Sequence, residues 1–157
     1  MILYHGSNME IHTPDTKHSR INVDFGKGFY TTPILEQAQR WCGKFRRRGE
    51  NAVISVFNFD ETALEKVNFI QFDSYSESWL DFVLHCRTGK DNSDYDIVIG
   101  GVANDKVFNT VELFFDGLIE KSEALKRLRY EKPNLQICFR NQEVIDVFLK
   151  FEGSKIL

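Results

Sequence analysis

Two short segments near the N-terminus hold side chains that could bind a planar ligand carrying hydroxyl groups. The first is Leu-Tyr-His-Gly-Ser over residues 3–7, and the second is Asp-Phe-Gly-Lys-Gly-Phe-Tyr-Thr-Thr over residues 24–32. The imidazole of His5 can hydrogen-bond a hydroxyl through one ring nitrogen while a neighbour fixes the other. Gly6 has no Cβ, so a planar carboxamide can exchange two hydrogen bonds with its main chain. The ring of Tyr30 can stack on a planar ligand.

The common motifs of other enzyme classes are missing from the sequence. There is no GxGxxG, no GxxxxGK[ST], no HExxH and no GxSxG. The three cysteines, Cys42, Cys86 and Cys138, are widely spaced and form no CxxC pair. This spacing argues against both a disulfide framework and a zinc cluster. We therefore expect a site that uses no metal.

The composition predicts a single folded domain over residues 1–157. The chain is 42% hydrophobic and contains 14 Phe, which suffices for an apolar core and argues against intrinsic disorder. Its net charge of -3 argues against a protein that neutralises many phosphates. No basic segment leads a long apolar run, and no stretch approaches the about 18 apolar residues of a membrane span. We expect a cytoplasmic protein without a signal peptide or a membrane contact.

The hydrophobic pattern mixes helices and strands without a regular β-α-β alternation. This mixture favours an α+β fold with a split or bent sheet over a doubly wound parallel fold. The clearest helix is predicted from Pro33 to about Arg48, with Thr32 as its N-cap, because apolar residues recur every three or four positions. Further helices are predicted over 60–64, 76–87, 107–115 and 122–130, and strands over 2–4, 29–31, 52–59, 67–72, 96–99 and 135–139.

Two segments give a weaker pattern. The polar stretch from His5 to Asp24 follows neither hydrophobic period and predicts an irregular surface loop, which at this length is usually functional or mobile. Near the C-terminus, a short helix or turn over 141–144 is predicted to lead into a strand over 146–151, although the helix could continue into that segment.

The two N-terminal segments, together with the helix that carries Trp41, resemble the nicotinamide-binding core of the poly(ADP-ribose) polymerase and diphtheria toxin group of ADP-ribosyltransferases. Over its length the chain is similar to a family of small bacterial ADP-ribosyltransferase-like domains of the H-Y-[EQ] type, formerly of unknown function. The resemblance implies an ADP-ribosyltransferase fold, a split mixed β-sheet with flanking helices, that binds NAD as substrate in its cleft. The shared segments are LYHGS, DFGxGFYTT, a YDIVIG-type segment and a QICF-type strand, at residues 3–7, 24–32, 95–100 and 136–139.

The resemblance also implies roles for individual residues. Tyr30 and Trp41 match the two aromatic rings placed around nicotinamide, although both could instead be ordinary core residues. Arg20 matches a basic residue near the adenosine side, where a guanidinium could clamp the pyrophosphate; a solvated surface arginine is the alternative. The implied catalytic residues are His5, Tyr30 and Gln136, and the implied NAD-binding residues are Gly6, Ser7, Arg20, Gly28, Thr32, Ala38 and Trp41.

The third catalytic position lacks a carboxylate. Cleavage of the bond between nicotinamide and ribose builds an oxocarbenium-like centre, which a carboxylate at the ribose 2'-hydroxyl would stabilise. Related enzymes place a Glu on a late strand, where this chain has Gln136 or, in a stricter overlay, Leu135. Glutamine can hydrogen-bond a hydroxyl but cannot act as a base at neutral pH. The resemblance therefore favours transfer of a single ADP-ribose over chain elongation.

The leading hypothesis is an NAD-dependent mono-ADP-ribosyltransferase that releases nicotinamide and modifies a macromolecular acceptor, either protein or nucleic acid. Small bacterial enzymes of this kind often act as toxins, so the resemblance also suggests a toxin restrained by an antitoxin protein. Three alternatives remain open: a non-catalytic sensor of NAD or ADP-ribose, an NAD glycohydrolase, and an enzyme that transfers an RNA 2'-phosphate to NAD. The enzyme that transfers an RNA 2'-phosphate would require a pair of basic residues in place of Tyr30.

Overall fold

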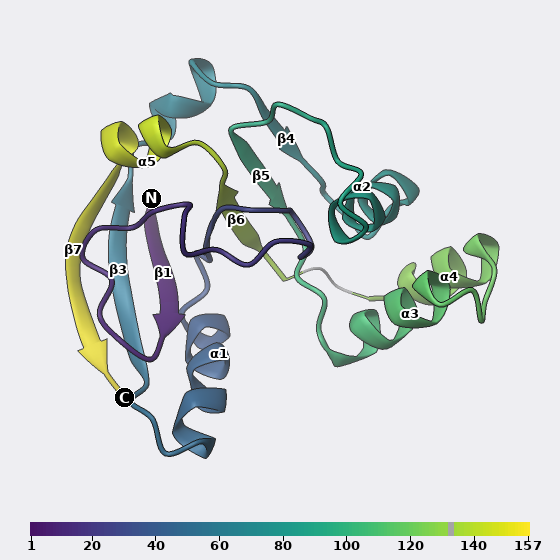
Figure 1. The fold of residues 1–157 in the computed structure, drawn as a ribbon, viewed down its shortest axis with the longest axis horizontal. Helices are drawn as coiled ribbons and strands as arrows, with labels where there is room; N and C mark the ends of the chain where they lie inside the picture. The colour runs from purple at the N-terminus through teal and green to yellow at the C-terminus, as the bar shows by residue number, and fades with distance from the viewer. Residues whose placement is uncertain (132–133) are drawn as a thin grey trace.

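The computed structural model describes residues 1–131 and 134–157 and contains two β-sheets with helices around them (Figure 1). The strands are β1 (Ile2–Ser7), β2 (Phe29–Thr31), β3 (Val53–Phe59), β4 (Phe69–Gln71), β5 (Ile97–Gly100), β6 (Gln136–Phe139) and β7 (Leu149–Ile156). The helices are α1 (Leu35–Arg47), α2 (Glu77–Arg87), α3 (Asp105–Phe115), α4 (Lys121–Leu128) and α5 (Gln142–Phe148), with one 3-10 turn, η1 (Glu61–Glu65).

In the described residues, one main-chain bridge joins the two sheets, between Tyr4 of β1 and Thr32, the residue after β2. One sheet has the strand order β1-β3-β7, and the other has the order β2-β6-β5-β4. The β4–β5 pair is parallel and the other pairs are antiparallel. Tyr4 and Thr32 join the sheets by exchanging two main-chain hydrogen bonds of 2.8 and 2.9 Å. The prediction of a mixed chain with a divided sheet is confirmed at this level.

Phenylalanines fill the space between the two sheets. The rings of Phe29 and Phe57 meet edge to face at 5.4 Å, and those of Phe59 and Phe139 do so at 5.1 Å. Each aromatic pair of this kind contributes about 1 kcal/mol beyond the burial of its surface. Because Phe57 and Phe59 belong to β3 while their partners belong to β2 and β6, this cluster fixes the two sheets against each other.

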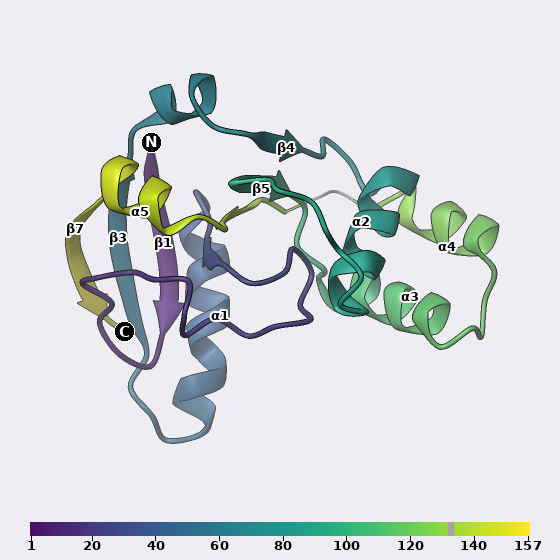
Figure 2. The same ribbon diagram turned by 45° about the horizontal axis from the view of Figure 1, so that its top comes forward.

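Helices α1 to α4 pack outside the core that lies between the sheets, whereas α5 contributes Val144 and Ile145 to that core. Helix α1 packs on β1 and β3 through Ala38 and Cys42, which are fully buried. Helices α2, α3 and α4 gather at the opposite end of the molecule, beyond the four-stranded sheet (Figure 2). Their apolar residues, among them Trp79, Val107 and Leu128, form a second core with Val98 and Cys138 of the sheet.

Helix α1 begins at Leu35, so the prediction of a start at Pro33 with Thr32 as N-cap was wrong. The N-cap is Ile34, and it makes no side-chain capping bond. Thr32 keeps an extended conformation because its main chain is held in the bridge to β1. Its hydroxyl accepts the N–H of Ile34 at 3.1 Å and donates to the carbonyl of Leu135 at 2.7 Å. This threonine therefore ties the chain before α1 to the start of β6.

Strands β1 and β7 are longer than the sequence predicted, because both pair with β3. Strand β1 continues to Ser7, because it pairs with β3 as far as Val53. At the C-terminus, α5 continues to Phe148 and the strand runs over Leu149–Ile156, not over 146–151. Pairing with β3 satisfies part of the main chain of both extensions, a contribution that a hydrophobic pattern does not register.

Candidate functional site

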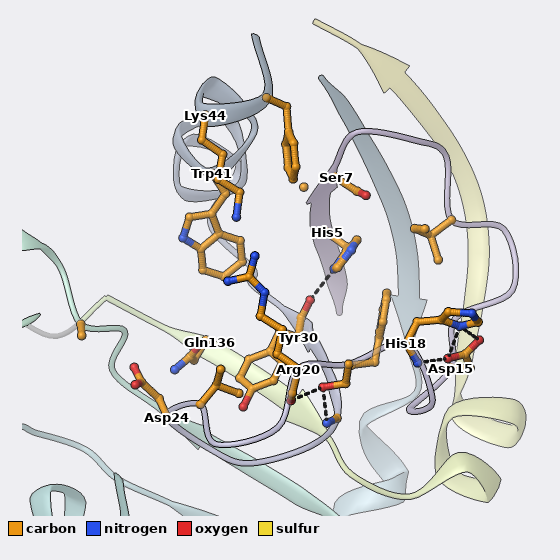
Figure 3. Close-up of a pocket in the computed structure, with 18 of the residues that line it drawn as sticks. His5, Ser7, Asp15, His18, Arg20, Asp24, Tyr30, Trp41, Lys44 and Gln136 are labelled. Atoms are coloured by element: carbon orange, nitrogen blue, oxygen red, sulfur yellow. Dashed lines mark hydrogen bonds and ion pairs between the residues drawn. The ribbon is translucent and has the colours of Figure 1, made fainter. Parts of the chain in front are cut away.

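A cavity of about 1110 Å³ opens where the two sheets separate, and most of the predicted site residues line it (Figure 3). Its walls come from β1, the loop that follows it, β2, α1, α2, α3 and β6. The predicted residues in these walls are His5, Gly6, Ser7, Arg20, Gly28, Tyr30, Trp41 and Gln136.

Thr32 and Ala38 are not among the residues that line the cavity. Both are fully buried. Thr32 lies in the bridge between the sheets, and Ala38 lies on the face of α1 that packs against β1. Each contributes to the position of the cavity walls rather than to their surface.

The imidazole of His5 has a fixed direction. Its Nδ1 lies 2.7 Å from the main-chain oxygen of Tyr30, and its ring stacks on Phe29 with a centroid distance of 4.5 Å (Figure 3). A carbonyl can only accept, so Nδ1 carries the hydrogen and Nε2 of the neutral ring is an acceptor. Burial lowers the pKa of His5 below its ordinary value of 6.5, which keeps the ring neutral at pH 7. His5 thus presents a hydrogen-bond acceptor to the cavity.

The main chain of Gly6 lies at the gap between the sheets. The N–H and C=O of Tyr4 point away from β3 and toward Thr32. Main-chain groups two residues apart on an antiparallel strand point the same way, so those of Gly6 also point away from β3. A continued ladder would pair Gly6 with Tyr30, but the strands separate after the bridge and the cavity lies between them. One donor and one acceptor are therefore available to a ligand.

The absence of a side chain at Gly6 has a structural cause. A Cβ there would lie 2.7 Å from the carbonyl oxygen of Ala38 and 2.9 Å from Sγ of Cys42. Helix α1 could not pack this closely on β1 with any other residue at position 6. Gly6 is thus required for the helix that carries Trp41, as well as being suited to contact with a ligand.

The hydroxyl of Tyr30 makes two hydrogen bonds with main-chain groups of its own segment. It donates to the carbonyl of Gly26 at 2.5 Å and accepts the N–H of Phe25 at 3.1 Å. Burial raises the pKa of Tyr30 far above its ordinary value, so the hydroxyl stays protonated. Gly26 has a φ of 77°, a left-handed conformation that favours glycine. The hydroxyl therefore secures the turn, and the ring is the part of Tyr30 that is available to a ligand.

A second close approach holds this turn against β6. A Cβ on Gly28 would lie 2.5 Å from Sγ of Cys138. The N–H of Gly28 donates to Oγ of Ser19 at 2.9 Å, which fixes the long loop next to Arg20. The spacing of the glycines thus places both the aromatic ring and the preceding loop at the cavity.

One corner of the cavity is aromatic and positively charged. Trp41 and Lys44 lie three residues apart on α1 and both face the cavity, and Arg20 approaches them from the loop (Figure 3). Burial lowers the pKa of Lys44, and the positive charges of Arg20 and Arg48 lower it further. Such closely placed cations are suited to binding an anionic group.

The opposite wall contains a charged cluster that the sequence analysis missed. Nε and Nη2 of Arg87, on α2, each lie 2.9 Å from Oδ1 of Asp24, and Nη1 bonds the carboxylate of Glu112 on α3. The guanidinium also lies over the ring of Phe108, 5.2 Å from its centre. These residues come from three distant segments, so no local pattern could have connected them. Asp24 alone lies in a segment that the sequence analysis singled out.

Gln136 is the first residue of β6 and is only 3% exposed. It lines the cavity, whereas Leu135 packs against the core between the sheets. In the part of the chain that the structure describes, the one hydrogen bond found for its side chain runs from Nε2 to the carbonyl of Gly101, at 3.5 Å. At that length the bond is weak, and the amide is free to bind a ligand.

Within residues 1–131 and 134–157, no group of three or more His, Cys, Asp or Glu side chains is arranged to hold a metal ion. The cysteines are free and buried. Burial raises the pKa of Cys86 and of Cys138 to about 12, so both thiols are protonated at neutral pH. In these same residues, no helix combines the length and the apolar character needed to cross a membrane.

A protein-family model matches nearly the whole chain. Its description is "Protein of unknown function (DUF3990)", and the match covers residues 1–151. No curated protein and no solved structure matches the chain. The geometry of the cavity is therefore the basis for assigning a function.

Proposed function

Since this chain belongs to the DUF3990 family, whose description gives no function, we propose a function from the geometry of its cavity. The protein is an NAD-dependent mono-ADP-ribosyltransferase with the split-sheet fold of the ADP-ribosyltransferases. It cleaves NAD, releases nicotinamide and transfers ADP-ribose to a macromolecular acceptor in the cytoplasm.

The observation that carries this proposal is the gap between β1 and β2. The main chain of Gly6 offers one donor and one acceptor there, which is what the carboxamide of nicotinamide requires. Tyr30 and Trp41 both line the cavity into which this gap opens. Aromatic faces attract a cationic ring such as the pyridinium of NAD. His5 Nε2 then accepts a hydrogen bond from a ribose hydroxyl.

The positive corner supports the same orientation of the ligand. Arg20 and Lys44 line the cavity together with Trp41 and can bind the two phosphates of NAD. A ligand that places its cationic ring at Tyr30 and its phosphates at Arg20 spans the cavity from the gap to the loop. The cavity volume of about 1110 Å³ is large enough for a dinucleotide.

The chemistry in this orientation is a substitution at C1' of the ribose. The bond between C1' and the nicotinamide nitrogen breaks, and its electron pair passes to the ring, which leaves as neutral nicotinamide. The acceptor's nucleophile attacks the oxocarbenium-like C1' and loses its proton. Such a dissociative step depends mainly on holding the ribose and the leaving group in place. His5 and the main chain of Gly6 supply that positioning.

A second candidate, a non-catalytic NAD sensor, is favoured by Gln136. The residue bears no charge and faces the cavity, so it can bind a ribose hydroxyl without stabilising positive charge. A sensor would bind NAD saturably and release no nicotinamide. An NAD glycohydrolase would release nicotinamide with no acceptor present.

A time course of nicotinamide release from NAD tests these candidates. We expect release that increases on addition of cell lysate, together with labelled ADP-ribose on a macromolecule. Trp41→Ala should lower release at least about tenfold through lost stacking and positioning. The matched control is Tyr130→Ala, because this aromatic side chain is 80% exposed and does not line the cavity. NAD binding without any release would favour the sensor, and absence of NAD binding would exclude both.

Expression of the protein in cells tests the biological role. If the acceptor is essential, expression should arrest growth and Trp41→Ala should relieve the arrest. A toxin of this kind requires a neutralising protein, so we propose an antitoxin as its binding partner. Normal growth at full expression of an active enzyme would exclude the toxin role.

A further inference from the structure

The proposed reaction develops positive charge at C1', and the residue facing it from β6, Gln136, carries no charge to oppose it. A carboxylate near the ribose would lower the barrier by electrostatic stabilisation. Under the proposed function, on which this inference rests, another group of the chain must supply that carboxylate.

Asp24 faces the same cavity as Gln136. Figure 3 draws the Asp24 carboxylate and the Gln136 amide in the same part of the pocket. Asp24 precedes Phe25, whose N–H is bonded to the Tyr30 hydroxyl, so its main chain is fixed to the ring proposed to hold nicotinamide. The loop thus places a negative charge beside the proposed ribose position.

Arg87 holds this carboxylate by one oxygen only. Both of its bonds, from Nε and from Nη2, reach Oδ1 of Asp24. Among the described residues no hydrogen bond is found for Oδ2, which leaves that oxygen able to accept one from a ribose hydroxyl. Arg87 also bonds Glu112, so one guanidinium faces two carboxylates and the cluster keeps a net negative charge.

We propose that Asp24 is a catalytic residue and supplies the carboxylate that β6 lacks. Oδ2 accepts a hydrogen bond from the ribose 2'-hydroxyl and stabilises the positive charge that develops as the bond from C1' to nicotinamide breaks. When the acceptor attacks C1', its proton passes to this carboxylate and then to water. Arg87 acts as a positioning residue, because it fixes Oδ1 and leaves Oδ2 directed to the ligand.

The first test is Asp24→Asn, which keeps the size of the side chain and removes its charge. We expect nicotinamide release to fall about 100-fold, as for loss of one strong electrostatic contact, while the NAD dissociation constant stays within about threefold. The matched control is Asp91→Asn. Asp91 pairs with Arg140 at 2.7 Å, both side chains are 14% exposed, and neither residue lines the main cavity. This control should release nicotinamide at the parental rate.

The second test moves the carboxylate to β6. The double variant Asp24→Asn with Gln136→Glu should release nicotinamide at least about tenfold faster than Asp24→Asn alone, since it again has a carboxylate in the cavity. If Asp24 only held the loop in place, a new carboxylate on β6 would not restore the rate. Failure of this rescue, with NAD binding intact, would therefore count against Asp24.

Two outcomes overturn the inference while leaving the proposed function intact. One is parental release by Asp24→Asn, and the other is a larger loss in Glu112→Gln than in Asp24→Asn, which would assign the charge to α3. If the parent protein binds NAD but releases no nicotinamide with or without lysate, the proposed function falls first and this inference with it.

Discussion

The two walls of the cavity are built by different physical means. The first, which we call the neutral wall, consists of His5, Gly6, Tyr30 and Trp41 and offers main-chain groups, a neutral imidazole and aromatic rings. The second, the charged wall, consists of Asp24, Arg87 and Glu112 and is held by ion pairs between segments far apart in the chain. In the proposed function, the neutral wall recognises the ligand and the charged wall stabilises the charge that develops in the reaction.

The largest expected effect is on the charged wall, from Arg87→Met. The change leaves two carboxylates facing each other without a counter-charge, and the side chains of Arg87 and Asp24 are only 12% and 18% exposed. Breaking a pair this deeply placed should lower the free energy of unfolding by about 3 kcal/mol. Urea denaturation of the parent protein and the variant measures this change in the free energy of unfolding.

The matched control for this change is Arg127→Met. Arg127 pairs with Glu123 on the surface of α4, with 45% and 43% exposure, so its loss should cost less than about 1 kcal/mol. Equal effects of the two substitutions would show that the charged wall is not a structural unit.

The two walls also differ in how far the sequence could predict them. Most of the neutral wall lies within residues 3–7 and 24–32, so two short segments sufficed to predict it, and the resemblance to ADP-ribosyltransferases added Trp41 on a clear amphipathic helix. The charged wall joins residues 24, 87 and 112. The sequence placed Arg87 correctly in the last turn of a helix, but no local pattern indicates which carboxylates a helix-end arginine will meet.

A similar limit applies to the fold. Periodicity located α1, α2 and most strands within a few residues, because their apolar faces are buried. It missed the full lengths of β1 and β7, where polar residues are held by pairing with β3. The sequence predicted a split or bent sheet but not the place of the division, at the bridge between Tyr4 and Thr32, because that bridge joins two segments far apart in the chain.

The next largest effect is expected on the neutral wall, from Tyr30→Phe. This change keeps the ring but leaves the N–H of Phe25 and the carbonyl of Gly26 without their partner. The free energy of unfolding should fall by about 1–2 kcal/mol, while NAD affinity changes less than about threefold. Tyr4→Phe is the control, since no hydrogen bond of its hydroxyl is found in the described chain. A large loss of NAD affinity in Tyr30→Phe would mean that the hydroxyl, and not the ring, contacts the ligand.

The third prediction concerns pH and His5. Burial lowers its pKa below 6.5, so the unfolded state takes up a proton first as the pH falls. Stability from this group is therefore complete above pH 6.5 and declines between 6.5 and the lower folded pKa, by at most about 1.4 kcal/mol per pH unit. The difference in unfolding free energy between the parent and His5→Gln should shrink across that interval and stay constant from pH 7 to 8.

Ligand binding should follow the same titration. Protonated Nε2 can no longer accept from a ribose hydroxyl, so NAD affinity should be flat from pH 8 to 6.5 and fall only in more acidic solution. A midpoint above 6.5 for this loss would contradict a buried, neutral His5 and would place the ring in contact with the charged wall instead.

The smallest expected effects come from substitutions of Trp41, which test whether this side chain binds the ligand by stacking or only by its volume. Trp41 is half-buried at the cavity, so Trp41→Phe should leave stability within about 0.5 kcal/mol. A phenyl ring still stacks, though over less area, and NAD affinity should fall only about threefold, as for a loss of about 0.6 kcal/mol. Trp41→Leu has comparable bulk but no aromatic face, so it should weaken binding clearly more than Trp41→Phe. Equal affinities of the two variants would show that Trp41 only fills space, and recognition of the cationic ring would then depend on Tyr30 alone.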